Sequence, residues 1–196
     1  MTPEINAHAL DTLFHAARTH SAWLDKPVDA GVLKQIYDLT KMGPTSANCQ
    51  PLRVTYITTP EAREKLRPCL DKGNIDKTMS APVTAILAMD LEFYNYLPTL
   101  FPHTDAKSWF VGKPDYIYNT AFRNSAIQGG YFILAARALG LDCGPMSGFD
   151  NTKLDQAFFA GTSIKSNFLV NLGYGDATQL HPRSPRPSFD EFCKII

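Results

Sequence analysis

Apolar residues recur at helical spacing in two segments near the N-terminus. The first segment spans 7–17, and the second begins after Asp29, a good N-cap residue, and ends before Gly43-Pro44. The apolar positions are Leu10, Leu13, Phe14 and Ala17 in the first segment and Val32, Leu33, Ile36 and Tyr37 in the second. This pattern predicts two amphipathic helices.

Three further segments have patterns typical of strands. Residues 52–58 alternate between apolar and polar, residues 82–89 are apolar on both faces, and 166–173 form the third segment. Thr59 predicts the N-cap of a helix between the first two strands, and Asp150 predicts the N-cap of another helix before the third. From the residues alone, the order of elements indicates a soluble α/β or α+β protein.

An apolar segment with a glycine-rich end is the most informative part of the chain. From Ala126 to Leu139 the only charged side chain is Arg137, so we expect a helix that is covered on nearly all sides. Gly129-Gly130 predicts that another backbone, from this chain or from a second subunit, packs closely against this helix. Gly140 ends the helix, and 142–150 is predicted to be a loop whose free backbone N–H groups can meet a ligand. The alternative is a core helix followed by a plain turn.

Three segments between these elements show no regular repeat of apolar and polar positions. Residues 44–51 (PTSANCQP) are predicted to form a rigid loop, either a plain turn or a ligand contact, because eight residues exceed what a tight turn needs. Residues 72–77 are predicted to be a polar turn. Residues 91–118 are rich in aromatic side chains and broken by prolines, so we expect them to cover a pocket or an interface.

Composition excludes several classes of protein. Lysine plus arginine equals aspartate plus glutamate at 19 each, which argues against nucleic-acid binding. The length of 196 residues predicts one domain over 1–196. No segment is long and apolar enough to span a membrane and the start lacks a signal-peptide pattern, so we expect a cytoplasmic protein. The four cysteines have no C-x-x-C spacing and are predicted to be free, buried thiols: Cys49, Cys69, Cys143 and Cys193.

The motifs of several enzyme classes are absent from the sequence. There is no G-x-G-x-x-G after a strand, no P-loop and no G-x-S-x-G, and the histidines lack the spacing of a metal site. An enzyme of this kind would therefore rely on a cofactor for its chemistry. Arg183 and Arg186, held by neighbouring prolines, are candidates for binding a phosphate, and Arg18 is a further cation. All three have an alternative interpretation as surface charges.

Several motifs taken together resemble the flavin-dependent nitroreductase family. They are the region around Arg18-Thr19, the loop PTSANCQP at 44–51, and ALGLDCGPMSGFD at 138–150. KMGPTSANCQP, FYNYLPTLFPHTDAKSWF and AFRNSAIQGGYFILAARALGLDCGPMSGFD are most similar to the malonic semialdehyde reductases of pyrimidine breakdown, a branch of that family. The resemblance implies an α+β fold of three layers, with a mostly antiparallel sheet between helices, and a homodimer with FMN at the subunit interface.

The resemblance also implies a role for particular residues. Those expected at the FMN phosphate are Arg18, Thr19, His20, Arg183 and Arg186. Those expected to face the isoalloxazine ring from the partner subunit are Pro44, Thr45, Ser46 and Asn48. Asn74 and Lys77 match polar contacts to the ring, and the backbone of Ser147 and Gly148 matches the loop beside flavin N5. Two positions depart from the family pattern: Ala17 stands where a second arginine is frequent, and Ser147 where an acidic residue is frequent.

The function implied is that of an FMN-dependent oxidoreductase that uses NADH or NADPH and transfers hydride by a ping-pong mechanism. The expected acceptor is a small aldehyde such as malonic semialdehyde, reduced to 3-hydroxypropionate. The alternatives are a broad reductase of nitroaromatics or quinones and a flavin-binding module without turnover. An acceptor with a carboxylate requires a cation, and the candidates are His103, Lys107, Lys113 and Arg123.

Overall fold

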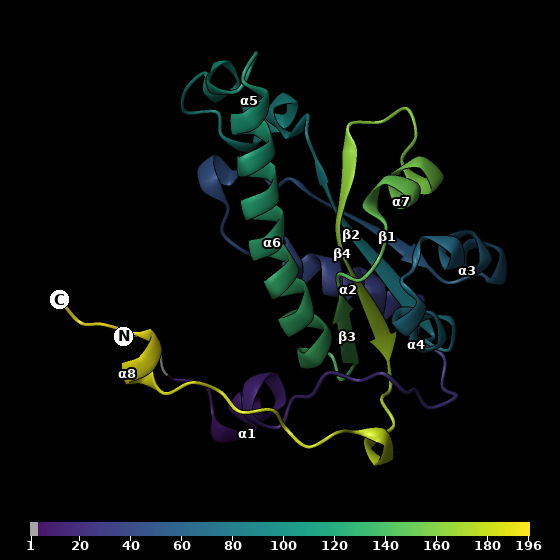
Figure 1. Ribbon diagram of the computed structural model, residues 1–196. Coiled ribbons are helices and arrows are strands. Elements are labelled where there is room, and N and C mark those ends of the chain that lie inside the picture. Colours follow the sequence, from purple (N-terminus) through teal and green to yellow (C-terminus); the bar gives the residue numbers. More distant parts are fainter. Residues whose placement is uncertain (1–3) are drawn as a thin grey trace.

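The computed structural model describes residues 4–196, and within them four strands form one antiparallel sheet in the order β1-β2-β4-β3 (Figure 1). The strands are β1 Leu52–Ile57, β2 Val83–Asp90, β3 Asp142–Met146 and β4 Ile164–Gly173. Leu52 pairs with Met89 at one end of the sheet, and Leu172 pairs with both Val83 and Cys143 at the other. β1 and β3 are therefore opposite edges of the sheet.

Residues 4–196 contain eight α-helices, three of which begin where N-cap residues predict them. The helices are α1 Ala7–Leu10, α2 Ala30–Thr40, α3 Pro60–Leu66, α4 Ile75–Met79, α5 Leu97–Leu100, α6 Pro114–Ala138, α7 Asn151–Phe158 and α8 Phe189–Phe192. The carboxylates of Asp29 and Asp150 accept backbone N–H groups at the starts of α2 and α7, and the Thr59 hydroxyl does so at α3. α1 continues into a π-helical turn at Asp11–His15.

Helices cover both faces of the sheet, which gives three layers (Figure 1). On one face, Ile36 of α2 and Phe132 of α6 share a hydrophobic cluster with Leu87 of β2. On the other face, Leu154 of α7 shares a second cluster with Ile86. β2 is buried along its whole length because successive side chains enter opposite clusters. The predicted α+β, three-layer architecture is confirmed.

Two short segments differ from the sequence prediction. The expected loop 142–150 is a strand in its first half, because β3 pairs with β4 from Asp142 to Met146. Pro145 is compatible with this strand because β3 lies at the edge of the sheet. The expected polar turn 72–77 is instead a 3₁₀ turn at Lys72–Asn74 followed by α4.

The central helix α6 is longer and more exposed than the sequence indicates. It begins at Pro114, inside the segment predicted to be irregular, with proline at its first turn. Tyr118, Phe122, Ile127 and Tyr131 are each between 41% and 49% exposed. The prediction of a helix covered on nearly all sides is therefore wrong for the single chain, which leaves one apolar face of α6 open.

The close contact predicted at Gly129-Gly130 also has a different origin. A Cβ atom at Gly129 would lie 2.5 Å from Cζ of Phe168, whose ring extends from β4 toward the helix. Gly130 has no neighbour within 4 Å of such an atom. The glycine at 129 therefore makes room for an aromatic side chain and not for a second backbone.

The chain beyond Asp176 runs beside the N-terminal segment that contains α1 (Figure 1). Its last apolar side chains, Phe189, Phe192, Ile195 and Ile196, are at least 60% exposed. No helix within residues 4–196 combines the length and the apolar character needed to cross a membrane.

Candidate functional site

A cavity of about 660 Å³ lies between the end of the N-terminal helical segment and the C-terminal tail. Its lining includes Arg18, Thr19, Arg137, Arg183 and Arg186. The structure thus brings together four of the five residues predicted at a phosphate. It adds Arg137, which the sequence analysis noted only as the single charged residue between Ala126 and Leu139.

Backbone carbonyls hold the side chains of three of these arginines. Arg18 donates to the carbonyl of His181, and Nη2 of Arg183 donates to the carbonyls of His15 and Ala17 at 2.7 and 2.9 Å. Arg186 donates to carbonyls of its own turn. The bonds of Arg18 and Arg183 cross between the tail and the N-terminal segment, so they fix these two walls of the cavity against each other.

The positive charge of this cavity is not neutralised by the chain. Among the residues that the structure describes, none of the four arginines forms an ion pair with a carboxylate. No aspartate or glutamate lines the cavity. Guanidinium groups gathered without a counter-charge favour an anion, and their planar donors match the oxygens of a phosphate.

His20 has a place that differs from the prediction. His20 is 6% exposed, and its Nε2 lies 3.3 Å from Oδ1 of Asp142. The ring packs so tightly on Gly175 that a Cβ atom there would lie 2.0 Å from its Nδ1. The His20 side chain therefore belongs to the interior and does not line the cationic cavity. Its backbone N–H donates to the carbonyl of Cys143 at 3.0 Å, which aligns the preceding Thr19 with β3.

A second group of predicted residues meets at the opposite end of β3. Nδ2 of Asn74 donates to the carbonyl of Gly148 at 2.6 Å, and the backbone N–H of Asp71 donates to the same oxygen at 3.1 Å. A Cβ atom at residue 148 would lie 2.3 Å from that Nδ2, so the close approach requires glycine. Ser147 is exposed, and Lys77 is half-buried in α4. The carbonyl of Lys77 accepts the indole N–H of Trp23 at 3.0 Å.

β3 connects the two groups. Thr19 forms a bridge with Cys143 at the start of the strand, and Ser147 follows directly after its last residue. Four residues of strand span about 13 Å at the usual rise. The arrangement suits an elongated ligand with an anionic group at one end and a polar ring system at the other.

The loop 44–51 has an unfavourable backbone. Ala47, Asn48 and Gln50 have φ angles of 49°, 49° and 42°, in the left-handed region that L-residues rarely adopt. No other non-glycine residue of the described chain has a positive φ. Strain of this kind persists where surrounding contacts enforce it and is frequent at functional sites.

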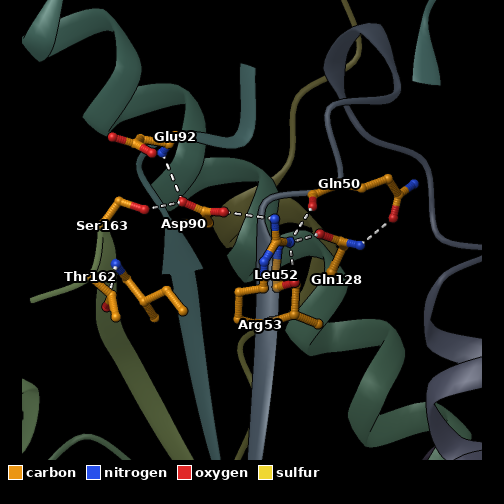
Figure 2. A network of polar contacts seen from close by, with 9 residues as sticks. Gln50, Leu52, Arg53, Asp90, Glu92, Gln128, Thr162 and Ser163 are labelled. Atoms are coloured by element: carbon orange, nitrogen blue, oxygen red, sulfur yellow. Dashed lines mark hydrogen bonds and ion pairs between the residues drawn. The ribbon is translucent and has the colours of Figure 1, made fainter. Parts of the chain in front are cut away.

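Two buried amides of α6, which the sequence analysis did not identify, hold this loop. Oδ1 of Asn124 accepts the backbone N–H of Ser46 at 2.8 Å. Gln128 donates to Oε1 of Gln50 at 2.6 Å and accepts the N–H of Leu52 at 3.1 Å (Figure 2). The available signal was a pair of amides four residues apart, on one face of a largely apolar helix.

The loop does not meet the rest of the predicted site within one chain. Asn48 and Gln50 line a separate cavity of about 780 Å³ beside β1. β1 and β3 are separated by two strands, so their axes lie about 14 Å apart at the usual spacing. Pro44, Thr45, Ser46 and Asn48 therefore form one group, whereas the arginines and the Asn74–Gly148 pair form another.

Arg53 lies in a dense network where β1 and β2 meet the loop (Figure 2). Its Nη2 donates to Oδ2 of Asp90 at 2.8 Å, and its Nη1 donates to the carbonyls of Gln50 and Leu52. Oδ1 of Asp90 accepts the Ser163 hydroxyl at 2.6 Å. The charge of Arg53 is thus balanced by a buried carboxylate.

Three of the four cysteines are buried free thiols. Burial raises the pKa of Cys49 to about 11 and that of Cys143 to about 12, so both stay protonated near neutral pH. Cys69 is also buried, whereas Cys193 is exposed, contrary to the prediction that all four are buried. Within residues 4–196 no three His, Cys, Asp or Glu side chains are placed to hold a metal ion.

None of the four candidate cations for a carboxylate-bearing acceptor lines either large cavity. His103 packs edge-on against Phe101, and Nζ of Lys113 donates to the carbonyl of Trp109 at 2.9 Å. Lys107 is half-buried and Arg123 is exposed. In the single chain none of these four side chains thus lies in the wall of a cavity that holds the predicted flavin contacts.

Comparison with known proteins places this geometry in a family. The model of the nitroreductase family matches residues 16–174. A relative from Burkholderia lata, named provisionally as an NADH dehydrogenase/NAD(P)H nitroreductase, is 62% identical over 95% of this chain and 96% of its own. One from Polynucleobacter asymbioticus, with the same provisional name, is 58% identical over 100% of both chains.

A solved structure agrees in fold. A provisionally named nitroreductase from Exiguobacterium sibiricum, in complex with FMN, superposes with a TM-score of 0.85 at 15% identity and 100% coverage of both chains. The sheet order, the three layers and the sequence match lead to one conclusion. This chain has the nitroreductase fold and belongs to the nitroreductase family.

Proposed function

We propose that this protein is an FMN-dependent oxidoreductase that takes hydride from NADH or NADPH and delivers it to a small acceptor. One observation carries the proposal: four arginines that have no carboxylate partner within residues 4–196 line a cavity at the start of β3. The NAD(P)H nitroreductase names of close relatives and the FMN in a structure of the same fold support it.

In this proposal each group of residues has a separate task. Arg18, Arg183 and Arg186 bind the phosphate, because charge-assisted bonds to a dianion are the strongest that these side chains make. Asn74 and Lys77 contact the ring, and the segment Ser147-Gly148 lies beside N5. Bound FMN supplies the hydride chemistry. The side chains orient the flavin and exclude water.

We further propose a homodimer in which the loop 44–51 of one subunit faces the flavin of the other. The support is that this loop lies away from the arginine cavity of its own chain. The open apolar face of α6 and the exposed apolar residues of the tail offer surface for a large interface. Sedimentation should find a dimer at micromolar concentration. A stable monomer that retains FMN would contradict the proposal.

The visible spectrum of the purified protein tests the cofactor. We expect the bands of oxidised flavin, their loss on addition of NADH or NADPH without oxygen, and their return when an acceptor is added. A colourless protein that cannot be reconstituted with FMN would refute the proposal. A yellow protein that oxidises no nicotinamide with any acceptor would instead be a flavin-binding module.

For the acceptor, the resemblance to malonic semialdehyde reductases supports a small aldehyde acid. The alternative, a broad reductase of nitroaromatics or quinones, is favoured by the relatives' names and by the two large cavities, whose walls contain none of the four candidate cations.

Comparison of kcat/KM for malonic semialdehyde and for a neutral quinone distinguishes the two proposals. If the acceptor is the aldehyde acid, replacing His103, Lys107, Lys113 or Arg123 should raise KM for malonic semialdehyde but not for the quinone. If none of these changes discriminates between the acceptors, the aldehyde proposal loses its physical basis.

A further inference from the structure

Arg137 lies in the last turn of α6, far along the sequence from the N-terminal and C-terminal arginines. It nevertheless lines the same cavity as Arg18, Arg183 and Arg186. It also lines an adjoining cavity of about 230 Å³ together with Ala17 and Arg18. Ala17 contributes only a methyl group to that wall, whereas Arg18 and Arg137 both line the same space.

The hydrogen bonds of Arg137 are incomplete. Its Nη1 donates to the carbonyl of Leu13 at 3.0 Å, which fixes the guanidinium against the first helical segment. Its Nε is buried and has no hydrogen-bond partner. Buried donors are almost always paired, so an unpaired one beside a cavity indicates that part of the group's binding capacity is unused.

The charge of Arg137 is also unbalanced. Among residues 4–196 it forms no ion pair. One carboxylate, that of Asp142, lines the smaller cavity, but Oδ1 of Asp142 lies 3.3 Å from Nε2 of His20 and its Oδ2 accepts the N–H of Gly175 at 2.9 Å. A carboxylate already engaged in this way compensates a second cation less.

We propose that Arg137 is a phosphate-binding residue that supplies, from the central helix, the charge missing at Ala17. The proposal rests on the proposed function, because the anion is the FMN phosphate. It assigns the phosphate to three parts of the chain: the N-terminal segment, the end of α6 and the tail. A purely structural role is the alternative, since a cation near a helix C-terminus and a bond to the Leu13 carbonyl are favourable on their own.

The test compares FMN with riboflavin, which has the same ring but no phosphate. Flavin fluorescence gives the dissociation constants of both ligands for the full-length apoprotein and its variants. We expect Arg137→Gln to raise the dissociation constant of FMN about tenfold to a hundredfold, as for the loss of a charge-assisted hydrogen bond. Riboflavin affinity should stay nearly unchanged. Arg137→Lys should retain most of the FMN affinity.

Two further variants serve as controls. Arg67→Gln removes an exposed arginine that pairs with Glu64 on α3 and should alter neither constant. Ala17→Arg, introduced into Arg137→Gln, should restore part of the preference for FMN, because it returns a guanidinium to the same wall of the cavity.

The outcomes separate the two proposals. If the wild-type protein binds FMN no better than riboflavin, the phosphate site itself is wrong and the proposed function fails. If the wild type prefers FMN and Arg137→Gln retains that preference, only the assignment of Arg137 is overturned. An equal loss of affinity for both flavins would show a structural role and would likewise overturn it.

Discussion

Two arginine environments in this molecule differ in how the positive charge is balanced. Arg53 donates to the buried carboxylate of Asp90 and to two carbonyls, and its guanidinium lies over the ring of Tyr96. Arg18, Arg183 and Arg186 are held by carbonyls alone. The first environment contains its own counter-charge, whereas within residues 4–196 the arginines of the second form no ion pair with a carboxylate.

The comparison separates structural arginines from ligand-binding ones without reference to a family. A buried cation with its own carboxylate stabilises the fold only as long as both partners remain. Cations that share a cavity without a carboxylate repel one another in the free protein, so they contribute little to folding and much to anion binding. Substitutions in the two environments should therefore affect different measurements.

The largest effect is expected from Asp90→Ala. This change leaves Arg53, whose side chain is 28% exposed, without its counter-charge, and removes the acceptor of Ser163. Breaking such a pair should lower the free energy of unfolding by about 3 kcal/mol. Urea denaturation measures the loss.

A double substitution provides the control. Arg53→Met with Asp90→Leu removes both charges and should cost less than Asp90→Ala alone, because no buried charge remains unpaired. If the double variant is less stable than the single one, the network stabilises the folded state through its hydrogen bonds and not through charge balance.

The second effect should appear in flavin affinity and not in folding. Arg18→Ala and Arg186→Ala should each weaken FMN binding by about 1.5–3 kcal/mol, which corresponds to about tenfold to a hundredfold in dissociation constant. Denaturation of the apoprotein should be nearly unchanged, since neither arginine has a carboxylate partner in the described chain. Unchanged FMN affinity in both variants would remove the phosphate site.

The third prediction uses pH, and it concerns the thiol of Cys143 beside the arginine cavity. Because burial raises its pKa to about 12, the folded chain keeps the proton while the unfolded chain loses it above the usual value of 9.0. The unfolded state is then favoured as pH rises. By pH 10 this difference in pKa lowers the free energy of unfolding by about 1.4 kcal/mol. Cys143→Ala should show a correspondingly smaller fall in stability between pH 8 and 10; equal slopes would contradict the prediction.

The sequence predicted the parts of the fold that depend on local signals. The caps at Asp29, Thr59 and Asp150 and the apolar run of β2 need no knowledge of distant residues. β3 was missed because its Gly and Pro have low strand propensity and only pairing with β4 makes it a strand. The exposed face of α6 was missed because apolar composition does not distinguish a core from an uncovered surface.

The candidate arginines were identified first from their chemistry and neighbouring prolines, and the resemblance then assigned them to the FMN phosphate. Arg18, Arg183 and Arg186 were named from separate segments, and the structure brings them to one cavity. The role of the His20 side chain was not foreseeable, because its burial depends on Gly175 and Asp142. Asn124 and Gln128 offered only the weak signal of two amides four residues apart, and Arg137 offered none for a ligand, because the partners of all three lie elsewhere in the chain.

The smallest effect concerns the strained loop, which is joined to the balanced arginine because Arg53 donates to the carbonyl of Gln50. Ala47 has φ of 49°, a conformation that glycine adopts without steric cost. Ala47→Gly should therefore raise the free energy of unfolding by about 0.5–1 kcal/mol, the relief of left-handed strain less the added flexibility of the unfolded chain.

The matched control is the same substitution at Ala126, an exposed position inside α6, where glycine should lower the free energy of unfolding by about 1 kcal/mol. Opposite signs for the two substitutions, measured by urea denaturation, would establish that the loop stores strain. Equal losses would mean that the contacts of Ser46 and Gln50 with α6 relax the backbone. In that case the hydrogen-bond network around Arg53 stabilises the fold but does not enforce the left-handed conformation of the loop. The contrast between the two arginine environments would then not extend into the loop beyond Gln50.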